Sequence, residues 1–571
     1  MTTTSDVRFF YDQRVLMRDG ITLSADVYLP HARGPFPTIV HRTPYESSAD
    51  RWITWAVWWA QRGYAVVVQD CRGKYESDGA FYAYHAEAAD GHDTIDWIGN
   101  QPWCNGKIGM WGRSYGALVQ WLLAPTASSM LTCLAPHVIS DDYYADVAYI
   151  GGAFQLGHGI LSTILYQTSV THVQGAGSAA LFNNPRFYRY LPLVDMDVAA
   201  IGKRIPWWRD WLEHPTNDAY WRAINWGNKL DRIDVPVFQQ SGWYDPYATA
   251  ALRQHDGLTK QAPSPRAQAG QKVIIGPYAH GVPTGTRLGE IDFGPNAAVD
   301  MLGEEKRWFD HWMREIDTGL LKEPPIRIFI MGANEWRFEH EWPLARTRFT
   351  PYYLHSNGRA NTLHGDGTLT PDAPTAEPPD QFEYDPSLPV WTVGGNNSMD
   401  SLTPHAVEPI IAGPVDQRPL ERRDDVLVYT SPVLAEDMEV TGPIEVVLYA
   451  ASSAKDTDFT AKLVDVFPNG YAMNLAEGIV RARYRCGTDR TELITPGEVA
   501  EYRIQLNPTS NLFKRGHRIR IDISSSNFPR FSRNLNTGED VATGIRMRIA
   551  HQTVLHTSEY SSHVVFPVIP A

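Results

Sequence analysis

The segment 112–116, Gly-Arg-Ser-Tyr-Gly, constrains the fold of this chain more than any other part of the sequence. It follows the apolar run 107–111 and precedes the helix-like apolar stretch 117–124. In a strand–turn–helix context, a G-x-S-x-G motif forms a tight turn that lifts the serine hydroxyl above the edge of a sheet. The motif therefore indicates a nucleophilic Ser114, and the alternative is an ordinary serine at a helix start.

The sequence around this motif has the rhythm of an α/β domain. Continuous apolar runs separated by helical stretches such as 84–98 are typical of parallel strands buried on both faces. The runs lie at 36–40, 64–68, 107–111, 235–238 and 273–275. We therefore predict that residues 1–140 and 234–345 form one α/β domain.

Two further parts of the chain have a different pattern. Residues 141–233 are aromatic and helix-patterned, which is most simply a helical cap inserted over the sheet. Beyond residue 346 short alternating segments, such as 444–448 and 518–523, are separated by Pro- and Gly-rich turns. This pattern predicts an all-β sandwich over 346–571. Segment 361–400 is expected to be a long irregular connection.

A serine nucleophile needs a base and a carboxylate that orients it. In this architecture the chain order is serine, acid, histidine, each placed after a strand. Asp245 follows the strand pattern 235–240, and His280 follows the pattern 272–276. His255 and His311 lie in helix-like stretches and are weaker candidates for the base. The alternative for Asp245 is a turn carboxylate.

The oxyanion of the reaction needs two hydrogen-bond donors. One is expected from the backbone N–H of Tyr115, directly after the nucleophile. The loop 41–45 should supply the second, but it lacks the glycine-rich pattern of lipases. The hydroxyl of Tyr45 could replace that donor. From the residues alone, Tyr45 could equally be an aromatic side chain with only a packing role.

Composition excludes several function classes. The chain has 571 residues, with 51 Lys and Arg against 65 Asp and Glu, so its net charge of −14 disfavours nucleic acid and anionic membranes as partners. Four scattered cysteines suggest neither a zinc site nor a disulfide framework. The start of the chain has no signal-peptide pattern, and no apolar run is long enough to span a membrane. We expect a cytoplasmic protein with a small-molecule ester substrate. Whether the chain forms homo-oligomers is left open by the sequence.

Several segments resemble the cocaine esterase-like family, which includes X-prolyl dipeptidyl peptidases, α-amino-acid ester hydrolases and glutaryl-cephalosporin acylases. The resemblance covers nearly the whole chain and is weakest in 141–233 and 355–400. The segments that carry it are RTPY (42–45), QDCRGKYESDG (69–79), GMWGRSYG (109–116), GWYDPY (242–247), GPYAHG (276–281), and the C-terminal stretches 440–472, 477–485 and 516–538.

The resemblance implies an α/β hydrolase with an inserted helical cap and a C-terminal all-β jelly-roll domain. It also implies serine esterase chemistry with no metal or other cofactor. Carried over by position, the triad is Ser114, Asp245 and His280. The oxyanion donors are the hydroxyl of Tyr45 and the N–H of Tyr115.

Departures from the family pattern narrow the range of acyl groups that the substrate is expected to carry. The amino-acid ester hydrolases carry acidic residues two and three positions after the triad Asp, where this chain has Tyr247 and Ala248. The cap stretch 146–154 keeps Asp146, but Val147 stands at the matching place. We therefore predict uncharged, bulky or aromatic acyl groups.

The predicted substrate contacts are Tyr247 and Trp243 in the pocket, with Ile410 and Ile411 at its rim. Two alternatives stay open. One is an amidase, acylase or peptidase-type hydrolase of the same family. The other is a non-catalytic protein that binds a ligand through its jelly roll.

Overall fold

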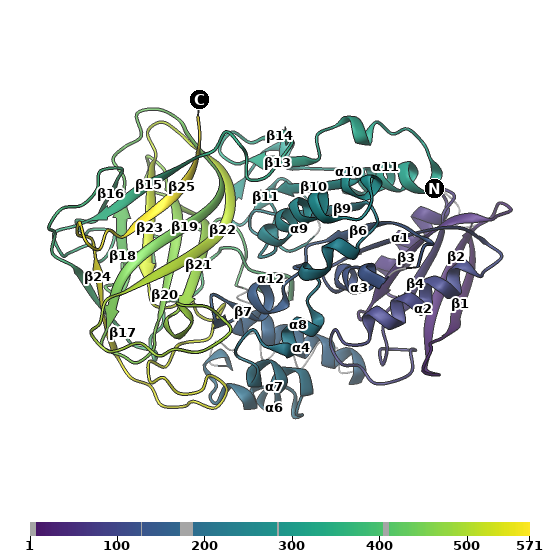
Figure 1. The fold of residues 1–571 in the computed structure, drawn as a ribbon, viewed down its shortest axis with the longest axis horizontal. Helices are drawn as coiled ribbons and strands as arrows, with labels where there is room; N and C mark the ends of the chain where they lie inside the picture. The colour runs from purple at the N-terminus through teal and green to yellow at the C-terminus, as the bar shows by residue number, and fades with distance from the viewer. Residues whose placement is uncertain (1–6, 127, 172–186, 282–284, 403–409, 571) are drawn as a thin grey trace.

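The computed structural model describes residues 7–126, 128–171, 187–281, 285–402 and 410–570. An α/β part, a helical part and an all-β part lie around a common centre near α12 (Met399–Leu402) (Figure 1). This architecture confirms the predicted α/β hydrolase with an inserted helical cap and a C-terminal all-β domain. Within the described ranges, none of the helices combines the length and apolar character that a bilayer-spanning segment needs.

The α/β part is built on a 10-stranded sheet with strand order β1-β2-β4-β3-β5-β6-β9-β10-β13-β14. The central strands β4 to β13 pair in parallel, and antiparallel strands close both edges. The strands are β1 (Val7–Leu16), β2 (Thr22–Pro30), β3 (Phe36–Thr43), β4 (Ala65–Asp70), β5 (Cys104–Arg113), β6 (Leu131–His137), β9 (Val237–Gly242), β10 (Gln271–Gly276), β13 (Ile326–Ile330) and β14 (Glu335–Glu339).

The apolar runs of this sheet are continuous because helices cover both of its faces. In β4, Ala65 and Val67 belong to one hydrophobic core, whereas Val66 and Val68 belong to another. The helices around the sheet are α1 (Asp50–Ala60), α2 (Glu87–Gly99), α3 (Tyr115–Leu123), α9 (Ala248–Gln261), α10 (Pro265–Ala269) and α11 (Met301–Arg314). The predicted strands and the predicted helix over 84–98 are thus confirmed.

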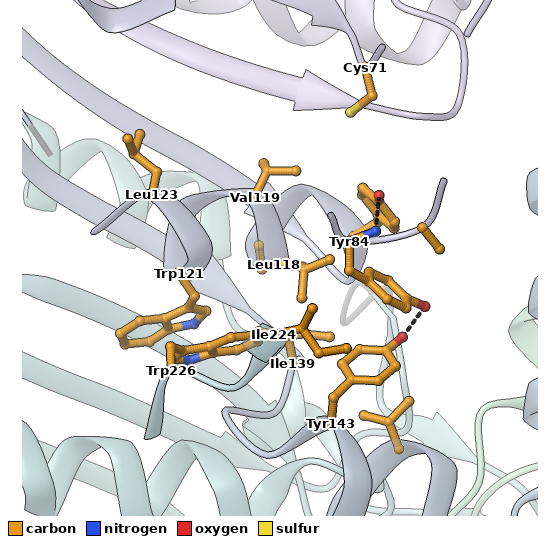
Figure 2. Packing of buried hydrophobic residues seen from close by; sticks show 14 of the residues in the cluster. Cys71, Tyr84, Leu118, Val119, Trp121, Leu123, Ile139, Tyr143, Ile224 and Trp226 are labelled. Atoms are coloured by element: carbon orange, nitrogen blue, oxygen red, sulfur yellow. Dashed lines mark hydrogen bonds between the residues drawn. The ribbon is translucent and has the colours of Figure 1, made fainter. Parts of the chain in front are cut away.

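The helical cap lies between β6 and β9 and packs on α3 of the hydrolase (Figure 2). The indole of Trp226 stacks on that of Trp121, with ring centroids 6.3 Å apart. The hydroxyl of Tyr143 bonds that of Tyr84. The main cap elements are a π-helix (Tyr143–Ala148), β7 (Tyr149–Ile150), β8 (Ala153–Phe154), α4 (Leu156–Thr171), α6 (Met196–Ile201), α7 (Pro206–Glu213) and α8 (Ala219–Ile224).

The all-β part contains an 11-stranded sheet in which β22 pairs with β19. Its strands are β15 (Arg348–His355), β16 (Thr368–Thr370), β17 (Asp380–Tyr384), β18 (Leu427–Thr430), β19 (Met438–Ser452), β20 (Asp458–Val466), β21 (Ala472–Arg481), β22 (Ala500–Phe513), β23 (Arg518–Ser524), β24 (Ala550–Leu555) and β25 (His563–Ile569). The expectation of an irregular segment 361–400 was wrong at β16 and β17, where neighbouring strands supply backbone partners that the local sequence does not reveal.

One hydrophobic core joins the α/β and all-β parts. It contains Trp243 and Ile328 of the hydrolase together with Leu448 and Ile521 of the all-β part. The hydroxyl of Tyr244 donates to the carbonyl of Asn474 at 2.9 Å. Consequently the acid loop that follows β9 is packed directly against the C-terminal domain.

Candidate active site

Ser114 occupies a strained turn between β5 and α3. Its backbone has φ 53° and ψ −120°, a conformation that non-glycine residues rarely adopt outside functional sites. A Cβ at Gly112 would lie 2.3 Å from the carbonyl oxygen of Gly116, and a Cβ at Gly116 would lie 2.8 Å from the ring of His41. Both glycines of the motif are therefore required by close approach, and the turn keeps Ser114 partly exposed.

Asp245 and His280 meet across the ends of two neighbouring parallel strands. Gly242 at the end of β9 pairs with Gly276 at the end of β10, which places the two following loops side by side. The Nδ1 of His280 lies 3.1 Å from Oδ1 of Asp245. The other oxygen, Oδ2, accepts a 2.6 Å hydrogen bond from the hydroxyl of Ser241. The fully buried carboxylate is thus held on both oxygens and can orient the imidazole.

The serine turn and the histidine loop are tied together by Arg113. Its Nη1 donates to the carbonyl of Gly281 at 2.9 Å and to Oε1 of Gln240 at 2.8 Å. Burial is the largest influence on this guanidinium and lowers its pKa, while the carboxylate of Glu305 acts in the opposite direction. Arg113 therefore fixes the loop of His280 relative to Ser114.

Tyr45 lies in the loop after β3, close to Ser114. The backbone N–H of Tyr45 donates to Oγ1 of Thr43 at 3.0 Å, which fixes the start of this loop. Burial raises the pKa of the Tyr45 phenol to about 12, and its hydrogen bonds with Tyr166 and Ser114 act in the lowering direction. The hydroxyl is thus a protonated donor beside the candidate nucleophile.

Tyr115 contributes its backbone rather than its side chain. Its hydroxyl donates to Oε1 of Glu87 at 2.9 Å and accepts the N–H of Tyr84 at 3.1 Å, both in the core. Tyr115 is the first residue of α3, and such an N–H has no partner within its own helix. The predicted pair of oxyanion donors, the N–H of Tyr115 and the hydroxyl of Tyr45, therefore lies around Ser114.

The predicted substrate contacts are only partly brought to this site. The ring of Tyr247 meets that of His280 edge-on, with centroids 5.4 Å apart. Ile410 packs against the same core as Tyr247, and Ile411 is 37 % exposed. Trp243 is instead fully buried in the core shared with the all-β part, where its Nε1–H donates to the carbonyl of Phe329 at 2.7 Å. Its indole is therefore a packing group of that shared core.

Three acidic residues at the start of the cap, Asp141, Asp142 and Asp146, have partners within the protein. Arg253 of α9 forms 2.5 Å ion pairs with Asp141 and Asp146. Asp146 also accepts a hydrogen bond from the hydroxyl of Ser140 at 2.5 Å. Asp142 caps the π-helix by accepting from the N–H of Ala145 at 2.9 Å. These carboxylates are committed to partners within the protein.

Comparisons with known proteins identify the family of the chain. Residues 19–282 match the model of the X-Pro dipeptidyl-peptidase (S15) family, and residues 318–565 match the model of the X-Pro dipeptidyl-peptidase C-terminal non-catalytic domain. The cocaine esterase of Rhodococcus sp. is 37 % identical over 97 % of this chain and 97 % of its own length. The chain belongs to the cocaine esterase family. It is accordingly a serine hydrolase and an esterase of the S15 type.

Solved structures share the fold of this cocaine esterase family member over its full length. An aminopeptidase from a marine-sediment Thaumarchaeota archaeon superposes with a TM-score of 0.86 at 24 % identity, covering 100 % of this chain and 98 % of its own. An α-amino acid ester hydrolase superposes with a TM-score of 0.82 at 24 % identity, covering 100 % and 97 %. At this identity the likeness establishes the fold.

Sequence reasoning missed several residues of the site. Ser241 lies near the end of β9 and precedes Asp245 by four positions, so its hydroxyl could have been considered as a partner of the acid. Arg113 stands inside the serine motif at a position that accepts any residue, which conceals its bond to the histidine loop. Tyr166 of the cap helix α4 and Arg253 of α9 gave no signal, because neither lies in a recognisable motif. Among the described residues, no group of three or more His, Cys, Asp or Glu side chains could hold a metal ion.

Proposed function

We propose that this esterase hydrolyses carboxylic esters with uncharged, bulky or aromatic acyl groups, with Ser114 as nucleophile. His280 takes the proton of the Ser114 hydroxyl as that oxygen attacks the ester carbonyl. The imidazolium then protonates the leaving alcohol, and an acyl-enzyme forms on Ser114. Asp245 accepts a hydrogen bond from Nδ1 of His280 and stabilises its charged form. Water, activated by His280, releases the acid in the second half of the cycle.

Both tetrahedral intermediates carry a negative oxygen that needs preorganised donors. The hydroxyl of Tyr45 and the N–H of Tyr115 supply them. The raised phenol pKa of about 12 keeps Tyr45 protonated at neutral pH. Removal of one such donor lowers kcat about 10²–10³-fold.

The pairing of two cap carboxylates with Arg253 is the observation that carries the acyl preference. An ammonium that leaves water needs a carboxylate, or its desolvation goes uncompensated. Asp141 and Asp146 are already paired with Arg253, and Tyr247 and Ala248 stand where relatives carry acids. Burial of an apolar acyl group against the aromatic ring of Tyr247 stabilises the complex by about 25 cal/mol per Å² of apolar surface.

The test compares two esters of one alcohol, a benzoate and a phenylglycinate, at a pH where the amine is charged. The expected result is a higher kcat/KM for the benzoate. Cation–π attraction to Tyr247 offers the ammonium about 0.5–2 kcal/mol, which does not reverse this order. A tenfold preference for the phenylglycinate would overturn the proposed acyl class.

The same argument disfavours an aminopeptidase-type activity, because such substrates also present an α-ammonium. An amidase acting on uncharged acyl groups differs in the leaving amine. Hydrolysis rates of a benzoate ester and the matching benzanilide separate the two, and we expect the ester to react faster. A binding protein without catalysis would hydrolyse neither substrate.

A further inference from the structure

Segment 69–79, one of the segments that carry the family resemblance, has no part in the chemistry proposed above. It begins in the last two residues of β4, which pairs in parallel with β3 and places Asp70 opposite Thr43. The N–H of Cys71 donates to the carbonyl of Thr43 at 2.9 Å. The start of this segment therefore lies beside the loop that carries Tyr45.

The carboxyl group of Asp70 is fully buried and holds this loop by two hydrogen bonds. The N–H of Ser47 donates to Oδ1 of Asp70 at 2.7 Å, and the hydroxyl of Ser47 donates to Oδ2 at 3.0 Å. Asp70 is itself fixed, because the hydroxyl of Ser77 donates to its backbone carbonyl at 2.8 Å. A buried carboxyl group is costly unless it is hydrogen-bonded, and both oxygens of this one hold Ser47.

The residue between Tyr45 and Ser47 has a strained backbone. Glu46 has a φ of 66°, in the left-handed region that residues other than glycine seldom occupy. Such a conformation persists where the surrounding contacts over-determine it. On one side of Glu46, Asp70 holds Ser47. On the other side, the N–H of Tyr45 donates to Oγ1 of Thr43 at 3.0 Å. Release of Ser47 would allow Glu46 to relax and would shift the backbone of Tyr45.

The position of the Tyr45 hydroxyl depends on this backbone, because the hydroxyl lies at the far end of a long side chain. The ring centre of Tyr45 lies 6.5 Å from that of Tyr115, the residue that follows Ser114. The carbonyl of Tyr45 also accepts a 3.3 Å hydrogen bond from Arg51, but that side chain is exposed and water can replace it. A displacement of about 1 Å in a catalytic group costs about 10²-fold in rate, so a firm hold on the loop matters for an oxyanion donor.

We propose that Asp70 is a positioning residue that holds the hydroxyl of Tyr45 in the oxyanion hole through Ser47. Asp70 acts through loop 45–47 and not on the substrate itself. This inference rests on the proposed role of Tyr45 in ester hydrolysis, and it gives segment 69–79 a task in that reaction.

The experiment measures kcat and KM for phenyl benzoate in Asp70→Ala, Asp70→Asn and Ser47→Ala, with thermal melts to establish that each variant is folded. Asp70→Ala removes both acceptors, and we expect kcat to fall about 10- to 100-fold with KM nearly unchanged. Asp70→Asn keeps an acceptor for the N–H of Ser47, and Ser47→Ala loses only the hydroxyl bond, so both should retain more kcat than Asp70→Ala. Asp78→Asn, at an exposed carboxylate of the same segment, is the matched control and should leave kcat unchanged.

A double-mutant cycle with Tyr45→Phe separates positioning of this hydroxyl from a general structural role. The hydroxyl is absent in Tyr45→Phe, so Asp70→Ala should lower kcat less than about 3-fold in that background. Unchanged kcat in Asp70→Ala, or the same fold loss in both backgrounds, would overturn the inference. If Asp70→Ala did not fold, the cycle would be run with Asp70→Asn and Ser47→Ala under the same criteria.

Failure of the proposed function gives a different result. A wild type that did not hydrolyse phenyl benzoate would contradict the proposed acyl class. Full kcat in Tyr45→Phe alone would remove the oxyanion role of Tyr45, and the task of Asp70 with it.

Discussion

Arg113, the residue before the candidate nucleophile, donates a 2.9 Å hydrogen bond to the carbonyl of Gly281, the residue after the candidate base. The serine turn and the histidine loop follow different strands, so their relative position depends on such cross-links. Arg113 is a positioning residue, because its guanidinium acts through the loop of His280.

Substitution Arg113→Met should lower kcat about 10²-fold, since a shift of about 1 Å in a catalytic group costs that much. KM should change little, because the ester-binding surfaces are untouched. Arg113→Lys keeps the charge near Glu305, so its kcat should fall between those of the wild type and Arg113→Met. Arg490→Met serves as an exposed control. Steady-state kinetics with a thermal melt test this, and a folded Arg113→Met enzyme with more than half of wild-type kcat would contradict it.

Tyr45→Phe removes a hydroxyl and keeps the ring. We expect kcat to fall about 10²–10³-fold with KM nearly unchanged, because the donor acts on the oxyanion that forms in the transition state. Kinetics on several esters provide the check. Full kcat in Tyr45→Phe on all of them would place the second donor elsewhere.

Lys74 lies buried under the cap, where its ammonium donates to the carbonyl of Tyr166 and lies 3.9 Å from the ring centre of Phe81. Burial lowers the pKa of this amine to about 7 from its ordinary value of 10.5. The folded state therefore binds fewer protons than the unfolded state between about pH 7 and 10.5, so this group makes stability rise with pH across that window. Below pH 7 the buried ammonium of Lys74 lowers the free energy of unfolding by its full amount.

Lys74→Met removes this contribution. Its melting temperature should exceed that of the wild type by more at pH 6.5 than at pH 9, while Lys203→Met, at an exposed lysine, should show no such difference. Thermal melts at the two pH values measure the gap. A gap that does not depend on pH would show that Lys74 keeps its ordinary pKa in the folded chain.

Truncation at residue 345 should yield an aggregating, inactive fragment. The cut would expose the core that Trp243 and Ile328 share with the all-β part, and it would remove Asn474, the partner of Tyr244. Size-exclusion chromatography and an esterase assay of residues 1–345 test this prediction. A soluble fragment with full activity would mean that the C-terminal domain is a separable module.

The sequence was most informative where local pattern and chemistry coincide. The run 64–68 predicted a strand buried on both faces, and the GRSYG turn placed Ser114 at the carboxyl edge of the sheet, because strand burial and turn geometry are local properties. The loops of Asp245 and His280 could be located by their position after strands.

Contacts between segments far apart in the chain could not be predicted in this way. The side chain of Trp243 gives no local sign that it faces Phe329 rather than the pocket. Arg253 pairs with acids more than 100 positions earlier, and His158 meets Ser398 across 240 positions. Such partners follow from domain packing.

Covalent labelling with a fluorophosphonate, followed by peptide mass spectrometry, tests most directly whether Ser114 is the nucleophile. The account predicts one phosphonylated residue, Ser114, in the wild type and in Ser241→Ala. It predicts no label in Ser114→Ala, and a loss of about 10⁴-fold or more in kcat for that variant. Label on a different residue, or a folded Ser114→Ala protein with a tenth of the wild-type rate, would contradict it.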